Sequence, residues 1–503
     1  MVTVLAIALA AVSLAICQFD RLWHNLPMRL PRLEFLGALH SVMNLPEATQ
    51  RRVFTMLLCL AACTSTPPAA LVACAADGTC PSDTHCVAGV CQAGAPTDAA
   101  GGDTSAGGDA GGDAVAADAG AICLPKLSGG PSARGESFGG FAAGKFMIMS
   151  GDDGVAQNCN PSPKPVADNW TFTPCVGWST VDAKAAPDPR ARAASTSDGS
   201  LLYAFGGRYR TAVGNYTLRN DTWVWSKAEG WQPLDDGTNG PKARSSTVLG
   251  IDTTTGTLWL YGGNASNNGL NFTPLGDVWK FTLGEAGWKS FKTTGKAPVA
   301  RIMHAGAVTQ DGKWLVIHGG GDANAFQGPF FGDTWRLDLK TGAWEEIGSG
   351  GAAPAARILG SMVAIGGNKV LLFGGHDDGA VGNRNDVWQL DADSGAWTVL
   401  RKGDLGKGGD PDAIFNKANG QCDFPGDFMQ LDLDSPERRE SALLTWDFVG
   451  KQAWLFGGKG DCGPLRDVWA FDPVKAEWTS HDDTPKGWSC LRYITPCSHL
   501  CGG

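Results

Sequence analysis

Six arginines recur along the sequence, each as the last residue of a Pro-x-x-Arg motif. A guanidinium group binds a carboxylate or a phosphate through two parallel hydrogen bonds, so several of them on one surface would bind an acidic ligand. In the alternative interpretation, each Arg pairs with a backbone carbonyl or an Asp of its own segment and organises the fold locally. These arginines are Arg134, Arg190, Arg244, Arg301, Arg357 and Arg439.

A Gly-Gly pair follows most of these arginines, and the segments after it differ in character. Residues 208–220 are basic and hold two Tyr, residues 264–276 are rich in amides, and residues 321–332 carry Phe side chains. Aromatic, amide and Arg side chains on one surface suit the recognition of a peptide or glycan. Alternatively, the Phe side chains only cover the base of their loop. The candidate binding side chains are Tyr209, Tyr216, Phe326, Phe330 and His376.

Motifs of known catalytic or metal sites do not occur in this sequence. It has no nucleophile elbow, no phosphate-binding Gly loop and no His-Glu-x-x-His motif. We therefore assign no catalytic residue, expect no cofactor and leave any metal ligands unassigned. His318 stands where other segments have Phe or Tyr, so we expect a core residue there.

Four marks in a fixed order show that these segments are repeats. After Pro-x-x-Arg come an apolar run ending in Gly-Gly, an Asp-x-Trp motif, and a second Trp eight or nine residues later. Successive Arg marks are 56, 54, 57, 56 and 82 residues apart, and residues 401–435 form an insertion in the last gap. The first unit has Ser150-Gly151 in place of Gly-Gly. The units lie near residues 131–181, 187–234, 241–291, 298–347, 354–400 and 436–480.

Each unit reads as four antiparallel strands joined by turns such as Asp311-Gly312. Such a sheet cannot cover both of its faces alone, so the units must stack, and closure into a ring removes most free edges. In this geometry the Arg ends and the loops after Gly-Gly share one rim. The two Trp of each unit would fill the space between neighbouring sheets.

The four marks resemble the kelch repeat, and six units resemble a six-bladed kelch β-propeller. The resemblance covers about residues 131–480 and implies an all-β fold. It also implies that partners bind around the central channel on the rim face. The Arg and loop side chains named above are then the predicted binding residues.

The N-terminal residues have the pattern of an export signal. Arg51 and Arg52 precede the apolar residues 53–60, and Leu60-Ala61-Ala62-Cys63 resembles the lipobox of bacterial lipoproteins. The resemblance implies lipidation of Cys63, which would hold the protein at a membrane. A signal peptide of normal length would begin at Met43, an alternative start of translation. The opposing interpretation is a buried apolar helix followed by a chance Cys.

Cysteine usage and composition divide the chain further. Twelve Cys follow Cys63, an even number that suits disulfides in an exported protein, with the pairing left open. Residues 97–121 are almost entirely Gly, Ala and Asp and cannot offset their own ordering entropy. The expected organisation is a leader over 1–62, a Cys-rich module over 63–92, a linker over 93–122 and the propeller over 123–503, with a Cys-rich tail over 481–503.

The function that these features favour is recognition. We expect an exported, membrane-tethered monomer in a bacterial cell envelope, an outer-membrane lipoprotein that faces the periplasm or the surface. It would bind a protein or glycan on the propeller rim without catalysis. A net charge of −10 argues against a nucleic-acid partner. The alternatives are a carbohydrate-active or oxidase-type enzyme on the same scaffold, and a structural surface protein; the fold alone does not separate them.

Overall fold

The computed structural model describes residues 84–87, 90–93, 129–154, 165–174, 176–181, 186–212, 215–268, 271–324, 327–348, 351–377, 382–406, 409, 429–460 and 463–482. The chain divides into two compact units, residues 1–116 and 117–503. In the first unit, β1 (Thr84–Val87) and β2 (Val90–Ala93) pair antiparallel. The predictions for Cys63, for linker residues 94–122 and for tail residues 483–503 lie outside the described residues. Within the described ranges, no helix is long and apolar enough to cross a membrane.

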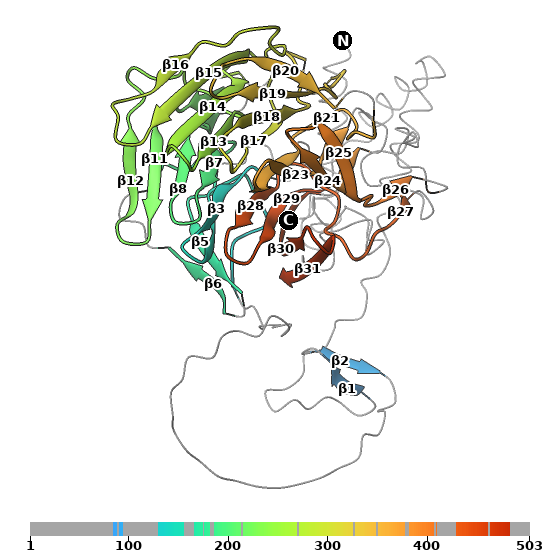
Figure 1. The fold of residues 1–503 in the computed structure, drawn as a ribbon. Helices are drawn as coiled ribbons and strands as arrows, with labels where there is room; N and C mark the ends of the chain where they lie inside the picture. The colour runs from blue at the N-terminus through green and yellow to red at the C-terminus, as the bar shows by residue number, and fades with distance from the viewer. Residues whose placement is uncertain are drawn as a thin grey trace, which may run out of the picture. The chain divides into compact units, whose positions relative to one another are not determined.

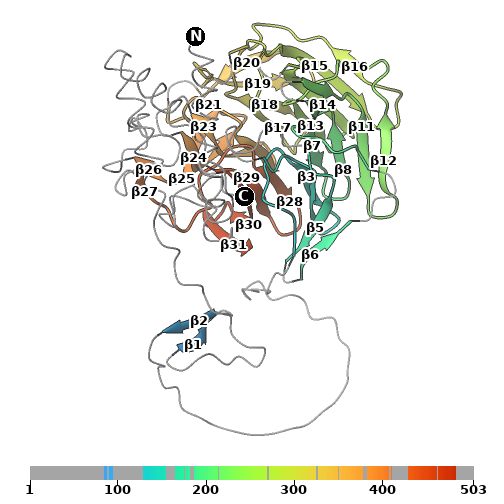
Figure 2. The ribbon, with the colours of Figure 1, turned by 180° about the vertical axis from the view of Figure 1, so that it is seen from behind.

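The second unit contains six antiparallel sheets, the blades, which are numbered here in chain order (Figures 1 and 2). Blade 1 holds β3 (Phe138–Ala142), β4 (Lys145–Met149), β5 (Asn169–Thr173) and β6 (Gly177–Thr180). Blade 2 holds β7 (Ala194–Ser197), β8 (Leu202–Phe205), β11 (Thr222–Ser226) and β12 (Gly230–Asp235). Blade 3 holds β13 (Val248–Asp252), β14 (Thr257–Asn264), β15 (Pro274–Thr282) and β16 (Lys289–Phe291).

The remaining blades follow the same strand order. Blade 4 holds β17 (Ala305–Val308), β18 (Trp314–His318), β19 (Thr334–Asp338) and β20 (Trp344–Ile347). Blade 5 holds β21 (Arg357–Ile358), β22 (Ser361–Gly366), β23 (Lys369–Asp377), β24 (Asn383–Asp391) and β25 (Ala396–Arg401). Blade 6 holds β28 (Leu443–Asp447), β29 (Gln452–Lys459), β30 (Pro464–Asp472) and β31 (Glu477–Asp482). Outside the blades, β9 (Arg208–Ala212) pairs with β10 (Asn215–Leu218), and β26 (Leu405–Gly406) pairs with β27 (Met429–Gln430).

The six blades form a closed ring (Figure 1), and residues of its inner strands line cavities along a central channel. The innermost strands β3, β7, β13, β17, β22 and β28 contact one another in that order, and β28 also packs against β3. All four strands of blade 1 come from its own unit, so no strand from the C-terminal tail is needed to complete it. The predicted six-bladed propeller is therefore confirmed.

The core of the ring lies between blades rather than within them. One cluster joins Tyr261 and Trp259 of blade 3 to Trp344 and Leu337 of blade 4, and another joins Phe172 of blade 1 to blade 6. The closing Trp of one blade meets the aromatic residue before Gly-Gly in the preceding blade: the rings of Trp344 and Tyr261 lie 5.2 Å apart. The second Trp of each repeat thus fills the space between sheets, as expected.

The first Trp of each repeat has a further role. The indole Nε1 of each Asp-x-Trp motif donates to the carboxylate of its own Asp, at 2.7–2.8 Å in all six blades. Residues two apart on a strand share a face, which makes this contact possible. Trp335 and Trp469 also belong to clusters between blades, and Trp223, Trp279 and Trp388 pack against such clusters. The expectation that both Trp of a repeat fill the inter-sheet space therefore holds for these five.

The same Asp also holds the Arg of the repeat. In blades 2 to 5, Nη1 and Nη2 of the Arg donate to the two carboxylate oxygens at 2.6–3.0 Å, and blades 1 and 6 make the same pair of bonds. Nη1 also donates to the carbonyl of the first Gly, for example Arg301 to Gly319 at 2.9 Å. Three of the four sequence marks are therefore parts of one hydrogen-bond network in each blade.

The second Gly of each pair links its blade to the next. Its N–H donates to the carbonyl oxygen of the following Arg at 2.8–3.3 Å, and Gly458 to Arg134 closes the circle at 2.9 Å. The backbone approaches closely here: a Cβ on Gly206 would lie 2.7 Å from the carbonyl oxygen of Arg244. In blade 1, Ser150 replaces the first Gly at φ 48°, and its hydroxyl accepts from Arg190 N.

Candidate functional site

The channel opens on the Arg face at a ring of six residues, each two positions after an Arg mark. All six have positive φ, between 53° and 58°. This conformation directs backbone groups from blade to blade, as in the 3.0 Å bond from Glu136 N to Ser441 O. The six side chains are of four kinds: acidic, basic, hydroxyl and apolar. We call these residues the mouth ring: Glu136, Arg192, Ser246, Met303, Leu359 and Ser441.

A cavity of about 130 Å³, the mouth cavity, lies inside this ring. It is lined by the mouth ring and by the neighbouring side chains of Ser137, Thr247, His304 and Ser361, among others. Met303 and Leu359 form an apolar side on blades 4 and 5. Glu136 and Arg192 form an ionic side on blades 1 and 2, and the two Ser stand between these sides.

The ionic side is a compact buried cluster around Glu136. Its carboxylate accepts from Arg192 at 2.8 Å, Arg208 at 3.0 Å and Lys459 at 3.2 Å, and only 2% of the Glu136 side chain is exposed. Burial opposes ionisation of Glu136, but the three cations outweigh it and hold its pKa well below the usual range. Lys459 also pairs with Asp152 at 2.9 Å. The named members of the cluster are three cations and two carboxylates, so the cations are in excess by one.

Beside this cluster, the hairpin β9–β10 rises from the loop after Gly-Gly in blade 2. The Arg208 guanidinium lies over the ring of Tyr216, 4.3 Å from its centroid. Tyr216 N donates to Asn267 O of blade 3 at 2.8 Å, which ties the hairpin to the amide-rich loop. Tyr209 lies on the paired strand opposite Thr217. The hairpin thus presents aromatic and basic side chains next to the mouth cavity.

The six arginines of the repeat do not form a binding surface. Each is at most 2% exposed, and its donors are used by the Asp carboxylate and by backbone carbonyls of its own blade. A ligand would meet no free guanidinium donor from Arg190, Arg244, Arg301, Arg357 or Arg439. The prediction that they bind an acidic ligand on the rim is corrected, and the alternative role in organising the blade describes them.

The aromatic candidates of blades 4 and 5 differ in how far they are buried. Phe330 is 9% exposed and packs on Ile302, Met303 and Ile358, so it covers the base of its loop. His376 is half-buried, with Nδ1 at 3.1 Å from Asn383 Oδ1. Its ring lies 6.3 Å from that of Phe330. Phe326 lies outside the described residues.

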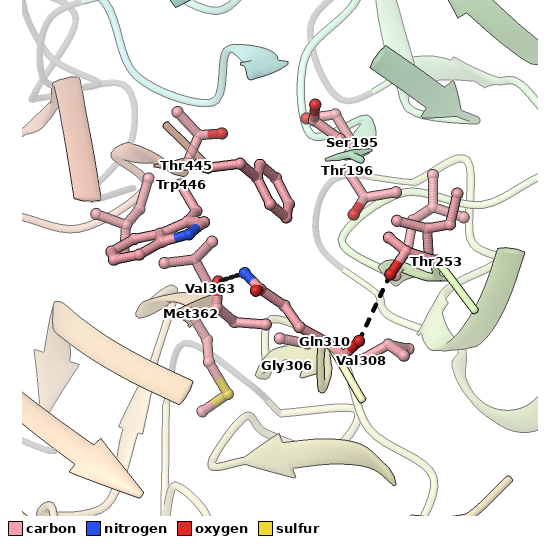
Figure 3. A pocket seen from close by; sticks show the side chains of 18 of the residues that line it. Ser195, Thr196, Thr253, Gly306, Val308, Gln310, Met362, Val363, Thr445 and Trp446 are labelled. Carbon is pink, nitrogen blue, oxygen red and sulfur yellow. Dashed lines mark hydrogen bonds between the residues drawn. The ribbon is translucent and has the colours of Figure 1, made fainter. Parts of the chain in front are cut away.

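The channel continues below the mouth cavity into a second cavity of about 80 Å³ (Figure 3). Small residues of the inner strands line it, such as Gly306 and Ser195, together with Trp446. Gln310 crosses toward the neighbouring blade and donates from Nε2 to Ala364 O at 3.0 Å. Within the described residues, no group of three or more His, Cys, Asp or Glu side chains could hold a metal ion.

Sequence reasoning missed the residues that surround the mouth cavity. His304 is 7% exposed, and burial, aided by the charge of Arg301, lowers its pKa to about 3, so the imidazole is neutral at pH 7. His318 lies in the core as expected, with its Nδ1 3.0 Å from Thr334 Oγ1. The available signal for the mouth ring was its fixed offset from each Arg mark. Because its six members are of five residue types, a search for repeated residues does not find them.

Comparisons with known proteins agree with this architecture. Residues 253–405 match the family model described as the KLHDC2/KLHL20/DRC7 Kelch-repeats domain. Host cell factor 1 of Rattus norvegicus is 30% identical over 232 residues, which cover 40% of this chain and 11% of that protein. N-(sulfonatooxy)prop-2-enimidothioate sulfolyase of Thlaspi arvense is 28% identical over 228 residues, 42% of this chain and 63% of the enzyme. Acyl-CoA-binding domain-containing protein 5 of Arabidopsis thaliana is 27% identical over 247 residues, 47% of this chain and 36% of that protein.

The chain thus spans only about a tenth of the length of Host cell factor 1. In this chain, each of the six blades has an Asp-x-Trp motif and a closing Trp, and five of them have the Gly-Gly pair. The described part of residues 129–482 is a six-bladed β-propeller built from kelch repeats.

Proposed function

We propose that this protein is an exported, membrane-tethered recognition protein that binds a protein or glycan partner on the Arg face of the propeller, without catalysis. One observation carries the binding proposal. The positions that build the blades keep their residue types in all repeats, apart from Ser150 in blade 1, whereas the six positions of the mouth ring hold five residue types. Function is carried by the site rather than by the fold, so such variation around one cavity suits the recognition of a specific partner.

The hairpin β9–β10 extends this surface. Its Tyr216 and Arg208 form a stacked aromatic–cation pair beside the mouth cavity. Aromatic and Arg side chains are over-represented among the residues that dominate binding interfaces. Kelch propellers commonly serve as protein-binding scaffolds, which also supports a binding role.

A peptide and glycan array probed with the full chain tests this proposal. We expect at least one specific partner, and we expect Tyr216→Ala to weaken its binding tenfold or more because the stacked pair is lost. The matched control is Phe448→Ala, an aromatic residue at the opposite end of the channel. Loss of binding in the control but not in Tyr216→Ala would place the partner on the other face and refute the proposal.

We propose export and a lipid anchor from the sequence features around Cys63. An n-region with Arg51 and Arg52, a short apolar run and two Ala precede that Cys. In a bacterial expression host, we expect labelled palmitate to enter the wild-type protein and not the Cys63→Ser variant. Cys59→Ser, a change within the same apolar run, is the control and should keep the label. Label retained in Cys63→Ser would refute the lipid anchor.

A further inference from the structure

Arg210, on strand β9, has no ion pair and no side-chain hydrogen bond among the described residues. The side chain is half-buried, and its Nε is sealed from solvent. Nη1 and Nη2 are not sealed, so a ligand can reach these donors. The arginines of the repeat, by contrast, use their donors on an Asp and on backbone carbonyls, as Arg190 does. Arg210 is therefore the arginine of this face that is available for binding.

The hairpin β9–β10 holds the Arg210 guanidinium in place through Tyr216. The two residues are paired across the strands, and the guanidinium lies 5.8 Å from the centroid of the Tyr216 ring. Residues two apart on a strand share a face, so the Arg208 guanidinium approaches the same ring, at 4.3 Å. Tyr216 N donates to Asn267 O of blade 3. Two cations are thus held beside one aromatic ring that is tied to the next blade.

The charge cluster around Glu136 does not supply a counter-charge for Arg210. Its two carboxylates are bonded to its own three cations, which exceed them by one. A further carboxylate nearby, Glu440 of blade 6, attracts Arg192 and Lys459. None of these carboxylates forms an ion pair with Arg210 within the described part of the chain.

The hairpin segment itself contains no acid. Residues 208–220 hold three Arg and no Asp or Glu. Arg219 pairs with Asp188 at 2.8 Å. Arg208 donates to the cluster through Nη2, and its Nη1 is neither bonded there nor sealed from solvent. The donors open to a ligand are therefore Nη1 of Arg208 and both Nη groups of Arg210.

These donors suit a single carboxylate. A carboxylate accepts two parallel N–H bonds from a guanidinium group. The chain as a whole has a net charge of −10, so a long anionic polymer, such as a nucleic acid or an acidic polysaccharide, would be repelled beyond the hairpin. A short acidic segment of a protein places one or two carboxylates at the hairpin without that repulsion. Tyr and Arg are also the side chains that dominate protein interfaces.

We propose that the hairpin β9–β10 binds an acidic segment of a protein partner, with an Asp or Glu carboxylate of that segment bonded to the Nη groups of Arg210 and to Nη1 of Arg208. This inference rests on the proposed function and names the partner class on the same face. Arg210 provides the selectivity for charge, and Tyr216 holds its guanidinium at the surface.

Paired peptides test the proposal on the full chain. A peptide array presents each acidic peptide beside a copy with Asn and Gln in place of Asp and Glu, and fluorescence anisotropy measures the affinity of the peptides that bind. We expect acidic peptides to bind and their amide copies to bind at least tenfold more weakly. The affinity should fall as the salt concentration rises, because salt screens exposed charges. Polyglucuronate is the polyanion probe and should bind more weakly than the acidic peptides.

Arg210→Gln should lower the affinity for an acidic peptide tenfold or more. It should not weaken binding of the amide copy further, because the carboxylate that pairs with Arg210 is already absent there. Arg210 has no bond to lose in the folded chain, so the variant should fold, and an unchanged thermal transition checks this. The matched control is Lys227→Gln, which removes the same charge from an exposed turn at the opposite end of blade 2 and should leave the affinity unchanged.

Four results would overturn the inference: equal binding of acidic peptides and amide copies, unchanged affinity in Arg210→Gln, tighter binding of polyglucuronate, or no acidic peptide that binds. In each case, array binding of another peptide or of a glycan that is lost in Tyr216→Ala would leave the proposed function standing. If no binding on the array depended on Tyr216, the proposed function would fail as well.

Discussion

Asp386→Ala is expected to lower the free energy of unfolding by about 3–5 kcal/mol, because it leaves a buried guanidinium without its counter-charge. The Arg357 side chain is 1% exposed and that of Asp386 6%. Two hydrogen bonds of 2.7 and 2.8 Å join them, and Trp388 Nε1 donates to the same carboxylate at 2.8 Å. The pKa of Asp386 lies below its ordinary value, since the charge and hydrogen bonds of Arg357 outweigh the opposing effect of burial.

Equilibrium denaturation followed by Trp fluorescence measures this effect. The control is Glu285→Ala, which removes an exposed ion pair with Lys289 whose side chains are 51% and 58% exposed. An exposed i,i+4 pair contributes about 0.3–0.5 kcal/mol. Arg357→Leu combined with Asp386→Leu should cost less than Asp386→Ala, because it leaves no lone buried charge. If Asp386→Ala costs no more than Glu285→Ala, the Arg–Asp–Trp network does not hold the blades.

That network explains why the fold could be predicted from the sequence. Arg357, Gly374 and Asp386 are separated along the chain, and one guanidinium bonds both partners. Five repeats keep all three residue types, and the first has Ser150 in place of the Gly. Their order along the chain was enough to count the blades. It did not reveal the Arg–Asp ion pair, because a sequence motif does not show whether a side chain is buried. Arg side chains are mostly exposed in proteins. The choice between a ligand-binding and a structural Arg needed coordinates.

The candidate site, unlike the fold, could be predicted from the sequence only in part. The loops that the sequence singled out do flank the channel, and Tyr216 lies at the mouth as part of a raised hairpin. The mouth ring was missed, since Ser246 and Met303 share nothing but their offset from the preceding Arg. The charge cluster around Glu136 was also missed, because it joins blades 1, 2 and 6 from ends of the chain that are more than 300 residues apart. Sequence spacing cannot predict contacts across a ring closure.

Acidification should destabilise the propeller well above the pH at which carboxylates are protonated. Burial, aided by the charges of Arg301 and Arg357 respectively, lowers the pKa of His304 and His318 from 6.5 to about 3. The unfolded chain binds these two protons as the pH falls below 6.5, whereas the folded chain does not until about pH 3. Their contribution to stability is therefore complete above pH 6.5 and is lost as the pH falls toward 3.

Two such groups should reduce the free energy of unfolding by about 3 kcal/mol between pH 6.5 and 5, because the unfolded imidazoles are half protonated at pH 6.5 and the slope approaches roughly 1.4 kcal/mol per proton and pH unit only below it. The pKa of His481, which burial also lowers, acts in the same direction, and that of Glu440, which burial raises, in the opposite one. The carboxylates with lowered pKa, Glu136 and Asp386 among them, act only below their ordinary values of 4.5 and 3.8. The interval from pH 6.5 to 5 therefore lies above the range of these carboxylates, and within it the raised pKa of Glu440 offsets part of the loss from the histidines.

Denaturation curves at pH 7, 6 and 5 measure the loss. His318→Phe introduces the residue found at the equivalent position of blades 2, 5 and 6, and His304→Thr introduces that of Thr247 in blade 3. Each variant should remove about half of the pH dependence, and the two together most of it, since neither new side chain titrates. Stability that is flat from pH 7 to 5 in the wild type, or a slope that persists in the double variant, would show that these imidazoles are protonated inside the fold.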